Sequence, residues 1–80
     1  MKINEIKKGD FVKAIFRKYG RHVVIGKVWE ISSDETPLPG VWVSLRVVDG
    51  DKKDKIVIAM IENKINVMVP IKDVIETIIK

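Results

Sequence analysis

The sequence predicts one small, mainly β domain over residues 1–80: a five-stranded barrel with a short helical turn or helix near its C-terminus. Isoleucine (13) and valine (12) far outnumber leucine (2), and branching at Cβ suits a pleated sheet better than a helix. Turn-forming residues recur at short intervals between apolar runs, which is typical of small barrels and sandwiches. A chain this short buries only about 60–65 % of its unfolded surface, so the core is small.

Turns rich in glycine, aspartate and proline separate the expected strands. These strands are Phe11–Arg17, His22–Ile31, Val41–Val48, Lys55–Ile61 and Ile65–Val69. After the third of them, Asp49-Gly50 favours a tight hairpin turn, because both positions tolerate positive φ. Pro70–Asp73 suits a single helical turn. The tail Val74–Ile79 fits either a helix or a strand.

Alternation along the first three strands separates an aliphatic face from a charged one. The aliphatic face, expected in the core, comprises Val12, Ala14, Phe16, Val24, Gly26, Val28, Val41, Val43, Leu45 and Val47. The opposite faces gather Lys13, Arg17, Lys27, Trp29, Trp42, Ser44 and Arg46. The segment Lys55–Ile61 is apolar on both faces, so either the C-terminal tail or a second copy covers it, and a homodimer is a possible state.

The charge is distributed unevenly along the chain. The net charge of +4 combines +6 in residues 1–29 with −2 in the remainder. A polyanionic partner for the first third is one interpretation, and an unevenly charged, solvated surface is the other.

Basic side chains interleaved with aromatic rings favour nucleic-acid binding. Lysine and arginine neutralise phosphates, tryptophan stacks on bases or inserts between base steps, and a serine hydroxyl donates to phosphate. The predicted contact residues are Lys13, Arg17, Arg21, Lys27, Trp29, Trp42, Ser44 and Arg46. The alternative for the two tryptophans is packing at the end of the barrel or against the tail.

Other kinds of site find little support. Without cysteine there is no disulfide or thiolate chemistry, and no serine lies in a nucleophile elbow. His22 is expected in a turn, adding to the basic surface or meeting solvent. The run from Asp49 to Met60 fails the calcium-loop pattern at its fifth, sixth and twelfth positions. We therefore expect no enzyme activity, no metal and no cofactor.

The sequence also predicts where the protein resides. Charged residues interrupt the first ten positions, so they do not fit a signal peptide, and no apolar run is long enough to span a membrane. We expect a cytoplasmic protein, nucleoid-associated if it binds DNA. Abundant lysine and isoleucine without glutamine fit a thermophile, and an AT-rich genome equally.

Three short motifs resemble those of SH3-like barrels: Ile6–Val12 with its Gly-Asp turn, Gly26–Val28, and Val69–Val74. In size, charge and composition the chain is similar to the small basic chromatin proteins of hyperthermophilic archaea. That resemblance implies a sheet that enters the DNA minor groove, with Lys27, Trp29, Trp42, Ser44 and Arg46 on the DNA face and Met60 or Val48 as a wedge. The chain has more acids and less lysine than that family. Sm-like RNA-binding barrels match less well, because their Asp-x-x-x-Asn signature is missing.

The leading hypothesis is a sequence-tolerant binder of double-stranded DNA, with an architectural or chromatin role. The second is a protein–protein adaptor or assembly subunit without a nucleic-acid role, in which both tryptophans are buried. The third is a small RNA-binding barrel.

Overall fold

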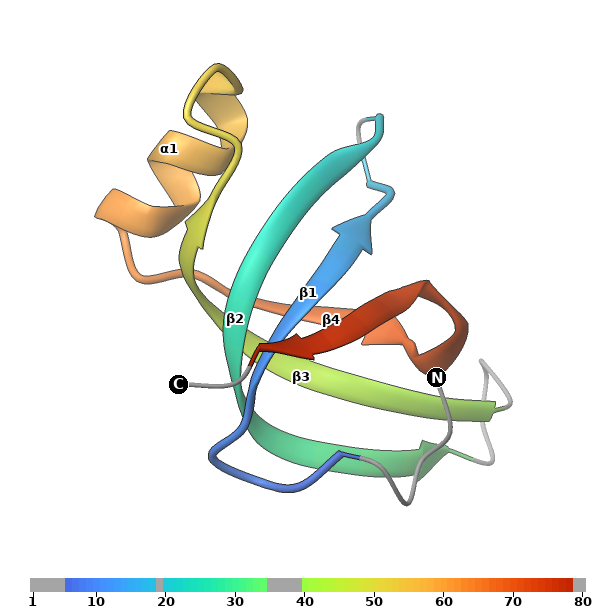
Figure 1. The fold of residues 1–80 in the computed structure, drawn as a ribbon. Coiled ribbons are helices and arrows are strands. Elements are labelled where there is room, and N and C mark those ends of the chain that lie inside the picture. The colour runs from blue at the N-terminus through green and yellow to red at the C-terminus, as the bar shows by residue number, and fades with distance from the viewer. Residues whose placement is uncertain (1–5, 19, 35–39, 79–80) are drawn as a thin grey trace.

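The computed structural model describes residues 6–18, 20–34 and 40–78, which form a curled antiparallel sheet and one short α-helix (Figure 1). The strands are β1 (Phe11–Phe16), β2 (His22–Asp34), β3 (Gly40–Gly50), β4 (Asn66–Pro70) and β5 (Val74–Ile78). Helix α1 (Lys55–Glu62) follows β3, and the 3-10 helix η2 (Ile71–Asp73) connects β4 to β5. The mainly β, five-stranded fold and the helical turn near the C-terminus are confirmed.

The strands lie in the order β4-β3-β2-β1-β5, and every neighbouring pair is antiparallel. The long strands β2 and β3 therefore occupy the middle of the sheet, while β4 and β5 form its edges. Within the described residues no ladder joins β4 to β5, so closure of the sheet into a barrel stays a prediction. The ambiguous tail is a strand, since β5 pairs with β1.

The segment from Lys55 to Glu62 is an α-helix, and the prediction of a strand there was wrong. Its Ile and Val residues favour a strand, yet the flanking residues supply helix caps. Asp54 begins the helix: its carboxylate accepts hydrogen bonds from the backbone N–H groups of Ile56 and Val57. Asn63 ends it, with its backbone N–H and its side-chain amide both donating to the carbonyl of Ala59. A tight hairpin at Asp49-Gly50 is therefore also wrong, because β3 leads into this helix.

The core lies on the concave side of the sheet and against α1. The largest fully buried side chains are mostly valines, contributed by β1 to β4 and α1: Val12, Val24, Val28, Val43, Leu45, Val47, Val57 and Val69. The predicted core face is confirmed at the positions of β1, β2 and β3 in this list, whereas Phe16 and Val41 are only partly buried, and Phe16 packs against the cluster.

Gly50 lets α1 approach the sheet closely. A Cβ at this position would lie 2.6 Å from a methyl group of Val57 and 2.7 Å from the carbonyl oxygen of Val23. The residue also has φ of +154°. Only glycine fits here without displacing the helix.

Several predicted boundaries differ from the observed ones. Strand β2 begins at His22 as predicted but continues to Asp34, β3 extends beyond both of its predicted ends, and β1 ends one residue earlier than predicted, at Phe16. The loop containing Pro37 and Pro39 lies outside the described residues, as does Ile79 at the predicted end of the last strand.

Candidate nucleic-acid interface

One row of side chains crosses the sheet on the face opposite the core. Strand pairing places Phe11 of β1 opposite Lys27 of β2, Lys27 opposite Arg46 of β3, and Arg46 opposite Asn66 of β4. Phe11 is also paired with Ile78 of β5. We call the four residues Phe11, Lys27, Arg46 and Asn66 the cross-sheet row. Neighbouring strands lie about 4.8 Å apart, so the row is roughly 14 Å long.

The two cations of the cross-sheet row are direct neighbours. Lys27 and Arg46 are both exposed, and like charges directly opposite one another destabilise a sheet. Each of the two side chains contacts its other neighbour in the row. The ammonium of Lys27 lies 5.9 Å from the centre of the Phe11 ring, and Nε of Arg46 donates to Oδ1 of Asn66 over 3.5 Å. The row thus has positive charge at its middle with no carboxylate opposite it.

Lys13 lies beside the cross-sheet row. It is half-buried, opposite Ile25 of β2 and Glu76 of β5. Together with Val23, Ile25, Gly50 and Asp51 it lines a shallow pocket of about 360 Å³. Lys27 and Lys13 lie two pairs apart on the β1–β2 ladder, since the Val12–Gly26 pair separates Phe11–Lys27 from Lys13–Ile25.

Trp29 occupies an irregularity of β2. The register shifts there, because Val28 pairs with Leu45 and the next paired residue, Glu30, faces Ser44. Trp29 is half-exposed, at 50 %. It follows Lys27 of the cross-sheet row by two positions along β2.

Trp42 lies apart from Trp29. It is half-buried and pairs with Ser32 and Pro70. It also lines a pocket of about 320 Å³ with Pro70, Ile71 and Lys72. Its partner Ser32 follows Trp29 by three positions, about 10 Å along β2.

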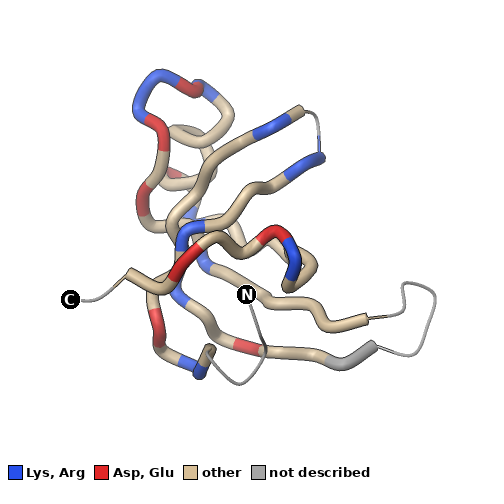
Figure 2. The backbone as a smooth tube through the Cα atoms, turned by 45° about the vertical axis from the view of Figure 1, so that its right-hand side comes forward, with Lys and Arg blue, Asp and Glu red and all other residues tan. Residues whose placement is uncertain are grey.

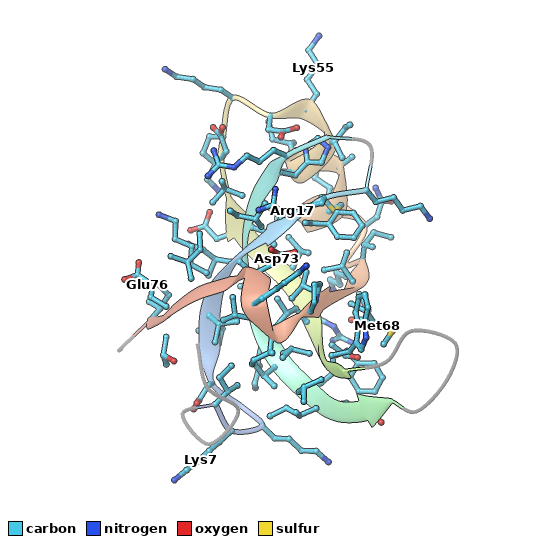
Figure 3. The ribbon with its side chains drawn as sticks, turned by 90° about the vertical axis from the view of Figure 1, so that its right-hand side faces the viewer. Lys7, Arg17, Lys55, Met68, Asp73 and Glu76 are labelled. Atoms are coloured by element: carbon cyan, nitrogen blue, oxygen red, sulfur yellow. The ribbon has the colours of Figure 1, made fainter. Side chains whose placement is uncertain are left out.

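Three more of the predicted contact residues are placed unfavourably for a shared face. Ser44 is only 5 % exposed, with Glu30 and Met68 as its neighbours on the adjacent strands. Arg17 follows β1, and its Nε lies 3.1 Å from Oδ1 of the buried Asp73 in η2 (Figure 3). Arg21 is exposed in the β1–β2 turn, near the end of the sheet.

Acidic residues border the cross-sheet row. Glu76 pairs with Lys13, Asp49 pairs with Ile25, and Glu30 pairs with Ser44. Figure 2 shows acidic and basic positions interspersed along the backbone rather than separated onto two faces. The positive strip is therefore narrow, and its flanks repel a polyanion.

Two further interpretations of single residues were wrong. His22 is buried, not exposed in a turn, and its Nδ1 lies 2.6 Å from Oδ2 of Asp54. Because a carboxylate only accepts, Nδ1 carries the proton. This hydrogen bond lowers the pKa of the Asp54 carboxyl below its ordinary 3.8, with the helix N–H groups adding to the effect and partial burial opposing it. Met60 lies on α1 and is buried, which removes it as a DNA wedge, whereas Val48 is exposed.

The contact between His22 and Asp54 gathers basic residues at one end of the molecule. It joins the β1–β2 turn to the loop before α1, and Figure 2 shows several basic positions there. The exposed cations of these two segments are Arg17, Lys18, Arg21, Lys52, Lys53 and Lys55. One of them is paired locally: Lys52 lies 2.7 Å from Asp49, and this hydrogen bond is the main reason that the pKa of Asp49 is lowered. Lys7 lies at the opposite end from Lys55 (Figure 3).

The sequence did not reveal the roles of Phe11, Asn66 and Ile25 beside the predicted cations. Finding them requires the register of four strands, including the irregularity at Trp29. The position of Lys13 between the buried Val12 and Ala14 gave a partial signal for the outer face. This alternation carries no information on which residues of the other strands lie opposite Lys13.

Within the described ranges no cluster of three or more histidine or acidic side chains could hold a metal ion. No helix in that part of the chain is long and apolar enough to cross a membrane. Comparisons with protein families, curated proteins and solved structures found no match.

Proposed function

We propose that this domain binds nucleic acid, with double-stranded DNA as the leading partner, through the cross-sheet row and Lys13. The observation that carries the proposal is the exposed like-charge pair of Lys27 and Arg46. A phosphate between them would replace their mutual repulsion with two attractive contacts. Such contacts are made to the backbone, so the binding would be tolerant of sequence and suited to an architectural role.

The neighbouring side chains support this proposal. Lys13 adds a third cation two pairs along the β1–β2 ladder, and the half-exposed Trp29 offers a ring for contact with sugars or bases. The bordering acids Glu30, Asp49 and Glu76 confine the polymer to the narrow strip. The proposed contact set is therefore Lys13, Lys27, Trp29 and Arg46. The predicted residues Arg17, Arg21, Trp42 and Ser44 are not needed for it.

A tryptophan fluorescence titration with duplex DNA tests this function. At low salt we expect quenching that saturates, because Trp29 lies next to the proposed contact, and weaker binding at higher salt as counterions compete. Trp29→Phe should remove most of the quenching, and Trp42→Phe should leave it. No saturable change at low salt would contradict the proposal. A single-stranded RNA of the same length serves as the comparison, and tighter binding to it would make RNA the partner.

A further inference from the structure

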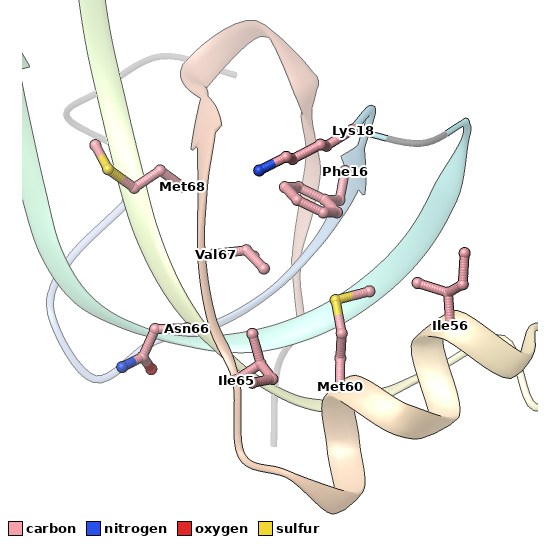
Figure 4. A pocket seen from close by; sticks show the side chains of 8 residues that line it. All are labelled: Phe16, Lys18, Ile56, Met60, Ile65, Asn66, Val67 and Met68. Atoms are coloured by element: carbon pink, nitrogen blue, oxygen red, sulfur yellow. The ribbon is translucent and has the colours of Figure 1, made fainter.

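A groove lies between α1, β4 and the end of β1. It has a volume of about 610 Å³ and is lined by Phe16, Lys18, Ile56, Met60, Ile65, Asn66, Val67 and Met68. Figure 4 shows Ile56 and Met60 rising from α1, Phe16 and Lys18 reaching over from β1, and Ile65 to Met68 forming the wall along β4. All but two of these side chains are apolar.

Three apolar side chains that line the groove are exposed. Ile56 and Ile65 are each 41 % exposed and Met68 is 48 % exposed, although the core is made of small valines. Exposed apolar side chains gathered in a concave surface are typical of a binding site.

One wall of the groove is an edge strand. β4 pairs with β3, and no other described strand pairs with it. An edge strand presents backbone N–H and C=O groups to which an extended segment can add, with alternate side chains entering the adjacent pocket. The shape therefore suits an extended polypeptide.

The charge around the groove is positive. Lys18 is part of its wall, and Lys55 and Lys64 directly precede the wall residues Ile56 and Ile65. The acids nearest in sequence are Asp54, which directly precedes Lys55 and accepts a hydrogen bond from His22, and Glu62, two residues before Lys64. Carboxylates on a partner would be attracted by three lysines and repelled by two acids, Glu62 and Asp54, of which Asp54 already accepts a hydrogen bond from His22.

We propose that this groove binds an extended, acidic segment of a partner protein, with apolar residues at alternate positions. The apolar residues enter between α1 and β4, while the carboxylates face the surrounding lysines. This site is separate from the proposed nucleic-acid interface except at Asn66, which touches both. A nucleic-acid backbone would leave the isoleucine walls without an apolar contact, so the groove takes a polypeptide.

The proposal is tested on the full chain by selection from a phage-displayed library of random peptides. Each peptide is about twelve residues long, which is longer than a typical strand. We expect the selected peptides to be rich in aspartate or glutamate, and we expect these acidic residues to alternate with valine, isoleucine or leucine. Binding of a selected peptide is then measured on three variants. Ile56→Ser and Ile65→Ser lie in the groove, and Ile75→Ser, at a 46 % exposed position of β5, is the matched control.

Each groove variant should weaken peptide binding by roughly tenfold or more, because an isoleucine loses its burial in the complex, and the control should bind like the wild type. The duplex DNA titration should be unchanged in all three variants, which separates failure of this site from failure of the nucleic-acid interface. Absence of any selected peptide, selection of basic peptides, or equal binding by the groove variants would overturn the proposal. Self-association of the protein would also overturn the proposal if it rises with concentration and if Ile56→Ser and Ile75→Ser each abolish it. The groove would then bind β5 of a second copy.

Discussion

The cross-sheet row and the groove lie side by side, yet they are built in opposite ways. The row is a flat arrangement fixed by the register of four strands, and its exposed centre is two like charges. The groove is concave and apolar, and one of its walls is a helix held by the contacts of Gly50, Asp54 and Val57. The row depends on the central strands, whereas the groove depends on the placement of α1. Changes that move α1 should therefore affect the two surfaces differently.

Gly50→Ala should lower the stability most and should change the groove more than the cross-sheet row. The added Cβ would lie 2.6 Å from Val57 and 2.7 Å from the carbonyl of Val23, so α1 or the end of β3 must move. Overpacking together with the positive φ should reduce the free energy of unfolding by about 3 kcal/mol. Urea unfolding measures the loss, and amide chemical shifts should change around Ile56 and Met60 more than around Lys27. Equal changes at both surfaces would show that the row also depends on α1.

Asp54→Ala should have the next largest effect. It removes the N-cap of α1 and the carboxylate partner of the buried His22. Loss of a helix cap costs about 1 kcal/mol, and we expect at least that loss in thermal or urea unfolding. Asp54→Asn is the matched control, because its side-chain oxygen can still cap the helix, and it should lose less. If both variants are as stable as the wild type, the cap does not hold α1.

The fold should become less stable in acid, because the Asp54 carboxylate is then protonated. The pKa of Asp54 is lower in the folded protein than its ordinary 3.8, chiefly because His22 donates a hydrogen bond to it. The stabilisation is therefore fully present above the unfolded pKa and is lost as the pH falls through the lower folded pKa. Unfolding measured between neutral pH and about pH 2.5 should show a steeper acid loss for the wild type than for Asp54→Asn. Parallel curves would contradict this role.

Arg46→Gln should have the smallest effect on stability and a clear effect on binding. Removing one of two like charges that face each other should raise the free energy of unfolding by about 0.3 kcal/mol at low salt. High salt screens the repulsion, so the gain should disappear there. Urea unfolding at two salt concentrations makes the measurement. A loss of stability at low salt would mean that the bond from Arg46 to Asn66 outweighs the repulsion.

The sequence predicted the central strands well because their alternation is regular. Val24 and Val28 on β2, and Val43 and Leu45 on β3, are buried as their spacing predicts. It failed between residues 51 and 62, where Cβ-branched residues favour a strand locally. There Asp54 and Asn63 cap a helix whose face, including Val57 and Met60, packs on the sheet. Tertiary packing and capping outweighed intrinsic propensity.

The candidate site was predicted only in part, for a reason of register. Lys13, Lys27, Trp29 and Arg46 share the outer side or its border, as the alternation suggests. The irregularity at Trp29 shifts the later pairs of β2 by one residue, so Trp42 lies opposite Ser32 rather than Ile31. Neither that shift nor the ion pair between Arg17 and Asp73, 56 residues apart, has a local signature in the sequence.

The most direct test of the central claim is the salt dependence of duplex DNA binding by the wild type, by the double variant Lys27→Gln/Arg46→Gln and by Lys53→Gln. Contacts from Lys13, Lys27 and Arg46 to three phosphates predict a log–log slope near −3, since each phosphate contributes about −0.9. The double variant should bind more weakly, with a slope near −1, and Lys53→Gln, an exposed cation in the loop before α1, should resemble the wild type. Equal slopes for the double variant and the wild type, or an equal loss in Lys53→Gln, would show that the cross-sheet row is not where the polymer binds.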